Sequence, residues 1–177
     1  MSGKRLGLKF YDRDTLEVAK DLLGKLLISE KGGERKVVRI VETEAYLRDD
    51  PASHSYRGET KRNRSMFKGP GTLYVYTMHR QNCMNVVTKR GEAVLIRAAE
   101  PVENVSGNTR GPGRLCRALG INRAEDDGKS LLSSDVYLLD DGFRPEDVVQ
   151  TTRIGISKAK DLPYRFYIKG SGYVSKR

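Results

Sequence analysis

Residues 36–46 alternate between two kinds of side chain with the two-residue period of a β-strand. Glu42, Glu44 and Tyr46 share one parity, and the other parity holds mostly β-branched and small residues. Alternation and β-branched content both favour an extended conformation. We therefore predict a strand over 36–46 that presents Glu42, Glu44 and Tyr46 on a single face.

The rest of the chain predicts short strands joined by turns, together with two helices. Apolar or alternating runs predict strands at 25–29, 72–78, 83–88, 93–98, 135–139, 153–157 and 164–169. Only four polar residues, 79–82, separate two of these strands, which predicts a β-hairpin. Capping residues place helices over 14–24, beginning at Asp14, and over 112–119, ending before Gly120. We expect residues 49–64 to form a long surface loop.

These elements predict one compact α+β domain spanning residues 1–177, without internal repeats or a low-complexity linker. We expect a β-rich sheet, mixed or antiparallel and open-barrel-like, with flanking helices and a protruding β-hairpin.

Composition excludes several classes of protein. No apolar run approaches the roughly 18–20 residues of a membrane-spanning helix, and the N-terminus lacks the apolar stretch of a signal peptide. We therefore expect an intracellular protein with no membrane partner. The two cysteines, Cys83 and Cys116, cannot form a disulfide framework. They and the two histidines lack the spacing of metal ligands, so we expect no metal and two small buried cysteines.

Positive charge is abundant and segregated along the chain. The net charge is +10 and the pI is about 9.7. Residues 57–68 hold five basic side chains against one acid, and residues 151–177 hold seven against one. Residues 125–150 instead hold eight acids against two basic side chains. Such segregation favours a polyanionic partner, with nucleic acid the first candidate, over the alternative that the charge serves solubility alone.

Two features suggest acid–base chemistry. A carboxylate such as Glu42 or Glu44, beside Tyr46 and apolar neighbours, can act as a general base on water. The alternative is an exposed strand face carrying ordinary solvated acids. Arg97 lies on an otherwise apolar strand and needs a partner if it is buried, which Glu44 would supply. In the alternative, Arg97 extends to the surface.

The hairpin and the loop before it suggest contacts with DNA. Met78, His79 and Arg80 stand at or beside the hairpin tip and can enter a groove, while Tyr76 can stack on an extruded base. The alternative is a structural hairpin with its tyrosines in the core. The basic run that contains Arg62, Asn63 and Arg64 suits phosphate contacts, although it can equally be a solvated charged loop.

A series of motifs then follows in order along nearly the whole chain. With x for a position outside the match, they are VETEAY at 41–46, HS at 54–55, RNRxMF at 62–67, PGTLYVY at 70–76, CMN at 83–85, LIRAxEP at 95–101, GPGRLCxAL at 111–119 and RFYIxGS at 165–171. In this combination the chain resembles the alkyladenine (3-methyladenine) DNA glycosylase family.

The resemblance implies a role for individual residues. Glu44 matches the glutamate that deprotonates the attacking water, and Arg97 matches the arginine that helps to position it, with the backbone near Ile154 completing the water site. The pocket around the flipped base is matched by Tyr46, His54, Tyr76 and Asn85, the last of which disfavours guanine. Phosphate contacts are expected from Arg62, Asn63, Arg64 and Arg114.

The chain departs from the family at the hairpin tip, where the usual tyrosine wedge is absent and the tip is shorter. His79 is the expected substitute, with Arg80 or Met78 behind it. The resemblance further implies a monomer that acts without a cofactor on double-stranded DNA containing damaged purines, including 3-methyladenine, 7-methylguanine, hypoxanthine and ethenoadenine. Because no lysine falls in the motifs, we expect hydrolysis by water alone. The alternatives are a non-catalytic nucleic-acid-binding module and a metal-dependent nuclease using Glu42, Glu44 and Asp49.

Overall fold

A computed structural model describes residues 3–176 of the chain. Its long central strand is β3 (Lys36–Tyr46), which has the bounds predicted from alternation. β6 (Glu92–Glu103) pairs with one edge of β3 along most of its length. β2 (Leu26–Ser29) and β9 (Arg165–Ile168) share the other edge, β2 at residues 36–39 and β9 at residues 42–44. The C-terminal part of the chain is thereby brought beside the two glutamates of β3.

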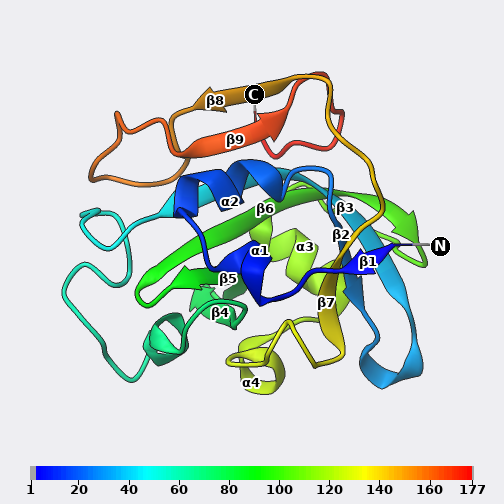
Figure 1. The fold of residues 1–177 in the computed structure, drawn as a ribbon, viewed down its shortest axis with the longest axis horizontal. Helices are drawn as coiled ribbons and strands as arrows, with labels where there is room; N and C mark the ends of the chain where they lie inside the picture. Colours follow the sequence, from blue (N-terminus) through cyan, green and yellow to red (C-terminus); the bar gives the residue numbers. More distant parts are fainter. Residues whose placement is uncertain (1–2, 177) are drawn as a thin grey trace.

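All the strand pairs are antiparallel. The strand order is β1-β7-β2-β3-β6-β5-β4, with β9 joining β3 and β8 joining β9. The remaining strands are β1 (Lys4–Arg5), β4 (Leu73–Met78), β5 (Gln81–Lys89), β7 (Val136–Asp140) and β8 (Val148–Thr151). The sheet curls into an open half-barrel, and the β8–β9 pair extends from it (Figure 1). This confirms the α+β, open-barrel-like prediction.

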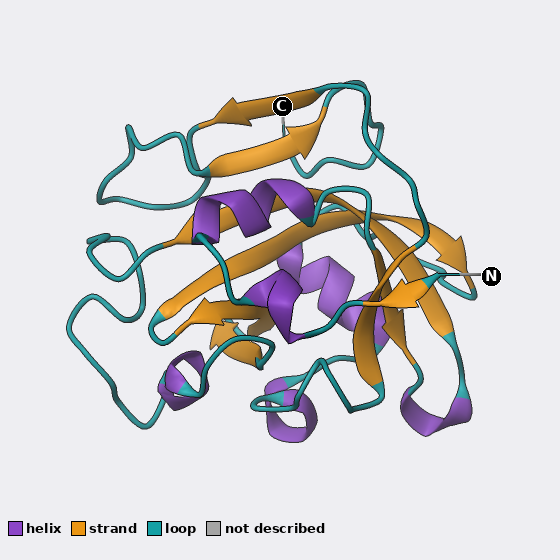
Figure 2. Cartoon of the chain, viewed as in Figure 1, coloured by secondary structure: helices purple, strands orange, loops and turns teal. Residues whose placement is uncertain are grey.

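Short helices cover the curled sheet. They are α1 (Leu8–Tyr11), α2 (Thr15–Asp21), α3 (Pro112–Leu119) and α4 (Arg123–Asp126), with 3₁₀ turns η1 (Lys31–Gly33) and η2 (Arg64–Phe67) (Figure 2). As predicted, the Asp14 side chain caps α2 by accepting from the Glu17 backbone N–H. α3 spans the predicted residues and ends at Gly120 in the left-handed conformation. No helix among residues 3–176 has the length and apolar character needed to cross a membrane.

Strand alternation separates a core face from a site face. Thr43 points to the core face, where its Oγ1 donates to the Ala19 carbonyl of α2 at 2.8 Å. Met84, Val94 and Ile96 belong to the same buried cluster. Glu42 and Glu44 point to the opposite face. Strict alternation is interrupted in β3 by an irregularity in its pairing with β6 near Glu42, so that Val38 and Ile40, which share the parity of the glutamates, lie in the core cluster with Ala45.

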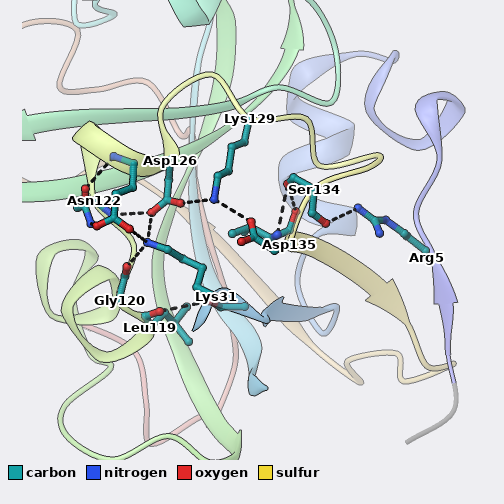
Figure 3. Close-up of polar contacts among 12 residues, drawn as sticks. Arg5, Lys31, Leu119, Gly120, Asn122, Asp126, Lys129, Ser134 and Asp135 are labelled. Atoms are coloured by element: carbon teal, nitrogen blue, oxygen red, sulfur yellow. Dashed lines mark hydrogen bonds and ion pairs between the residues drawn. The ribbon is translucent and has the colours of Figure 1, made fainter. Parts of the chain in front are cut away.

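A polar network fastens α4 to the rest of the fold. Lys31 Nζ and Lys129 Nζ each lie 2.7 Å from a carboxylate oxygen of the buried Asp126, and Lys129 also bonds Asp135 (Figure 3). Burial opposes ionisation of Asp126, but the hydrogen bonds from Lys129 and Lys31 hold its pKa below the ordinary value. These two lysines are therefore fully paired inside the fold.

Two local predictions were wrong. Residues 153–157 are not a strand, and the strand in this region is β8, which ends at Thr151. The Ile154 N–H donates to the Glu44 side chain instead of a neighbouring strand. The hairpin tip consists of two residues, His79 and Arg80, not four, because Met78 pairs with Gln81. One cysteine prediction also needs correction: Cys116 is buried, whereas Cys83 is only partly so.

Candidate active site

A cavity of about 360 Å³ opens on the site face, between the β4–β5 hairpin, the 152–156 segment and the start of α3. Its walls are rich in aromatic rings and carry few polar groups. The lining includes Tyr46, His54, Tyr76, Asn85, Leu95 and Arg97. An apolar cavity with a few convergent polar groups is the usual form of a site for a small organic group.

Glu44 lies fully buried behind this lining. Its Oε1 accepts a hydrogen bond from the Tyr46 hydroxyl at 2.8 Å, and its Oε2 accepts one from the Ile154 backbone N–H at 2.8 Å. Nη1 of Arg97 lies 3.5 Å from Oε1. The alternative of a solvated, exposed acid is therefore wrong for Glu44, and the predicted pairing of Arg97 with Glu44 is present. Burial, followed by the charge of Glu44, raises the pKa of Tyr46, so its hydroxyl stays protonated and donates.

Glu42 is equally buried but has a different set of partners. Its Oε1 accepts from both the backbone N–H and the hydroxyl of Ser175, at 2.8 and 2.7 Å. Its Oε2 accepts from Arg165 Nη1 at 2.9 Å. Nε of Arg97 donates to the Ser175 hydroxyl at 3.4 Å. Arg97 therefore lies between the two glutamates, with Nε 3.9 Å from Glu42 Oε2 and Nη1 3.5 Å from Glu44 Oε1, while Arg165 is the nearer partner of Glu42.

A second buried ion pair holds the segment that supplies the Ile154 N–H. Arg153 forms a two-point ion pair with Asp50, with both side chains almost wholly buried. Its Nη1 also donates to the Ala45 carbonyl at 3.0 Å, and its guanidinium lies 4.7 Å from the centre of the Tyr46 ring. Residue 153 is therefore bound to β3 and to the loop that begins at residue 47, which fixes the position of Ile154.

His54 and Tyr76 form one aromatic wall. Their ring centres are 4.0 Å apart, and the His54 Nδ1 is 3.0 Å from the hydroxyl of Tyr74. Loss of water around the ring, reinforced by the charge of nearby Arg62, lowers the pKa of His54 below its ordinary value. His54 is accordingly neutral at pH 7. Asn85 lines the same cavity, and its Nδ2 donates to the Tyr74 carbonyl at 3.2 Å, so the amide is held in one orientation.

The hairpin tip stands at the mouth of the cavity. His79 and Arg80 both adopt left-handed backbone conformations, with φ of 50° and 64°. This turn is normally made by Asn-Gly, and other side chains there carry strain. Met78 and His79 line the cavity, whereas Arg80 is exposed and does not.

Comparison with known proteins identifies the family. A family model described as methylpurine-DNA glycosylase matches residues 9–172. The chain belongs to this family. It is 49% identical over 188 residues to a protein of Methanoculleus marisnigri, covering 95% of this chain and 97% of the relative. Relatives from Anaeromyxobacter sp. and Carboxydothermus hydrogenoformans are each 46% identical, covering 97% and 96% of this chain and 93% and 97% of their own lengths. All three are named for 3-methyladenine DNA glycosylase activity.

Membership makes the chain a DNA glycosylase, an enzyme that hydrolyses the bond between a base and its sugar in DNA. In this glycosylase the structure gathers Glu44, Arg97, Tyr46, His54, Tyr76 and Asn85 at one cavity. Among residues 3–176, no three His, Cys, Asp or Glu side chains converge as a metal site would require.

The basic residues of the glycosylase are placed unevenly. Arg62 lies over the Tyr76 ring at 4.9 Å, and Arg64 and Arg114 are exposed. Asn63 differs from them because it is only 3% exposed. Its amide bonds the Thr60 N–H and the carbonyls of His54 and Gly58. The structure therefore gives Asn63 the role of shaping this loop, in place of the expected phosphate contact.

The sequence offered Glu42 as a candidate general base or nuclease residue but predicted none of its partners. It gave no role to Asp50, Arg153, Arg165 or Ser175. The available signal was weak: Arg165 opens an apolar strand, Asp50 is one of three consecutive charged residues at the start of the predicted loop, and Arg153 is the first residue of a segment that was predicted to be a strand. Their partners lie more than 100 residues away along the chain. No local pattern could pair them.

Proposed function

We propose that this glycosylase excises damaged purines from double-stranded DNA by monofunctional hydrolysis, with Glu44 as the general base. The observation that supports the proposal is the environment of Glu44: a buried carboxylate, directly behind the lining of an aromatic cavity, that faces Arg97 and is fixed by Tyr46 and Ile154. Cleavage of a glycosidic bond develops positive charge on the sugar. A carboxylate held in this low-dielectric position stabilises that charge and accepts the proton of the attacking water.

Glu44 has capacity left for the water. Each carboxylate oxygen offers about two acceptor sites, and each Glu44 oxygen accepts one hydrogen bond in the structure. A water that donates to Glu44 and accepts from Arg97 would face the sugar of a base seated in the cavity. Because Tyr46 and Ile154 restrain the carboxylate, little reorganisation is needed during the reaction.

The cavity walls suit a purine that has left the helix. The His54 and Tyr76 rings are too close together to admit a base between them, so a flipped base would stack against their shared surface and opposite Tyr46. Neutral His54 does not repel a cationic alkylated base. This supports 3-methyladenine and 7-methylguanine as substrates, and the aromatic walls equally accept the neutral hypoxanthine and ethenoadenine. The fixed Asn85 amide would disfavour the amino group of normal guanine.

The surroundings of the cavity would engage the DNA. We assign insertion into the base stack to His79, with Arg80 beside it in the strained two-residue tip and Met78 beside it at the end of β4. Exposed Arg62, Arg64 and Arg114 would contact phosphates. We expect the enzyme to work as a monomer without a cofactor.

The test is a glycosylase assay with EDTA present, on duplexes that carry one hypoxanthine, ethenoadenine, 7-methylguanine or 3-methyladenine. Wild type should produce alkali-sensitive sites, and Glu44→Gln should lose excision by a factor of at least about 100 while still binding DNA. Gln keeps the size of Glu but cannot accept the proton. Unchanged excision by Glu44→Gln would refute Glu44 as the base.

The same assay separates the alternatives. A non-catalytic binding module would release no base from any duplex, and a metal-dependent nuclease would be inactive in EDTA. Borohydride treatment of the reaction should trap no covalent complex, because water is the nucleophile. A trapped complex would show that an amine attacks the sugar and would overturn monofunctional hydrolysis.

A further inference from the structure

A second cleft, of about 540 Å³, lies on the helix-covered side of the sheet, at the outer surface of α1, α2 and the end of β7. It shares no lining residue with the active-site cavity, and α2 is bound to the core face of β3, opposite to Glu44. Its charged lining consists of five basic side chains and two acids, a net of +3: Lys9, Arg13, Lys20, Lys25, Arg144, Asp21 and Asp140.

Lys25 is the unusual member of this lining. It is only 6% exposed, and its amine forms no hydrogen bond or ion pair with any residue from 3 to 176. The amine faces the Phe10 ring, whose centre lies 5.9 Å from Nζ. Buried charges are normally paired, since removing an ammonium from water costs several kcal/mol. Lys31 and Lys129, for example, both form ion pairs with Asp126 (Figure 3).

The acids near Lys25 are already occupied. Asp21 pairs with Arg13 at 2.9 Å, and Asp140 accepts two hydrogen bonds from Arg144 at 2.9 and 3.0 Å. Burial lowers the pKa of the Lys25 amine, and the nearby carboxylates only partly oppose this. The positive charge of Lys25 therefore lacks a counterion of its own within the described chain.

Two further amines line the same cleft without a carboxylate partner among the described residues, although that of Lys20 lies 5.9 Å from the centre of the Phe166 ring. Lys9 and Lys20 are exposed, and neither forms an ion pair with a described residue. Three lysine amines around one concave surface provide the donors that a tetrahedral oxyanion needs. Apolar side chains such as Leu23, Pro145 and Val148 line the rest of the cleft and suit the organic part of an ester.

We propose that this cleft is a phosphate-binding site, in which Lys25 is the buried anchor and Lys9 and Lys20 close around a free phosphate ester of about nucleotide size. The Lys25 amine is not among the fully enclosed unpartnered atoms, so it is open to the cleft that its side chain lines. An anion here would give this ammonium a counterion and would bind independently of a base in the active-site cavity. The same chemistry could be met by a DNA backbone phosphate, and the experiment distinguishes the two sources.

The first arm measures thermal unfolding by circular dichroism in phosphate, in deoxyadenosine 5′-monophosphate and in chloride at equal ionic strength. At ten times its Kd, the ligand should raise the Tm of wild type by roughly 3–6 °C. Lys25→Met, which keeps the length and removes the charge, should abolish this rise. Lys169→Met, an exposed lysine elsewhere, is the matched control and should keep it. No rise in wild type, or equal rises in Lys25→Met and Lys169→Met, would overturn the proposal.

A second variant covers the case in which Lys25→Met does not fold. Lys20→Met changes an exposed position and should weaken phosphate binding several-fold with an intact fold; an unchanged affinity would overturn the site. Excision of damaged bases should be the same in wild type and in both cleft variants, because the cleft lies on the other face from Glu44.

The second arm identifies the source of the phosphate. Binding of an undamaged duplex is followed by fluorescence anisotropy as salt is raised. An unchanged salt dependence in Lys25→Met, together with the lost response to free phosphate, supports a free ester as the ligand. A slope reduced by about one charge would instead assign the site to a DNA phosphate.

Discussion

Breaking the buried Arg153–Asp50 pair should destabilise the protein more than any surface ion pair does. Arg153→Met leaves the Asp50 carboxylate, whose side chain is 1% exposed, with the Ala52 N–H as its remaining hydrogen-bond donor. It also removes the donor to the Ala45 carbonyl. Removing one partner of a buried pair typically costs about 3–5 kcal/mol. For a domain of 177 residues, this corresponds to a Tm lower by roughly 6–20 °C.

The assay is a double-mutant cycle with urea unfolding at pH 7, followed by circular dichroism. Asp50→Asn should also destabilise, and the double variant with Arg153→Met should be less destabilised than the sum of the singles by roughly 2–3 kcal/mol. Arg35→Met is the matched control, since its ion pair with Glu30 is on the surface and such pairs contribute about 0–1 kcal/mol.

The cycle has a functional readout as well. Because Arg153 positions the Ile154 N–H on Glu44 and packs near Tyr46, excision by the folded fraction of Arg153→Met should fall mainly in kcat. An unfolding free energy of Arg153→Met within about 1 kcal/mol of wild type, or single effects that simply add, would show that the buried pair contributes no coupling energy.

Three further predictions concern Ser175, His54 and Gly91. Ser175→Ala removes a hydrogen bond to Arg97 and should lower kcat of excision about tenfold with little change in KM, as measured in single-turnover and steady-state assays. The depressed pKa of His54 means that the unfolded chain takes up a proton that the folded chain resists, so stability present above about pH 6.5 is lost as pH falls. Urea unfolding between pH 7 and 5 should therefore show a shallower loss for His54→Gln; equal pH profiles would contradict this. Gly91→Ala places a Cβ 2.5 Å from Cδ of Arg48 at a φ of +82°, and should cost more than about 1 kcal/mol of unfolding free energy; an unchanged Tm would show that Arg48 moves freely.

Some elements could be predicted because neighbouring residues along the chain specify them. Alternating residues predicted the strand from Lys36 to Tyr46. A proline at its start and a glycine after its end predicted the helix from Pro112 to Leu119. Alternation also placed Glu42 and Glu44 on one face, which the structure confirms despite irregular pairing between β3 and β6 near Glu42. The resemblance to a glycosylase family added the expected roles of the site residues, which local patterns left open.

The hairpin shows a limit of prediction from neighbouring residues. Its two strands are predicted correctly, but the sequence predicts a tip of four residues because a run of polar side chains fits a strand as well as a turn. Gln81 and Asn82 belong to β5, where each pairs with a residue of β4. Likewise, Asn63 reads as one more polar residue in a basic run, and only its burial shows that its amide holds the loop together.

Alternating residues and turn signals predicted the strand-rich fold class and a shared face for the two glutamates, and the ordered motifs predicted the family. How each glutamate is used depends on contacts that only the folded chain makes. Glu44 meets Ile154 across 110 positions of the chain, and Glu42 meets Ser175 across 133. The physical reason is that alternation and capping depend on neighbouring residues, whereas the partner of a buried charge depends on which distant segments the packed sheet brings beside it.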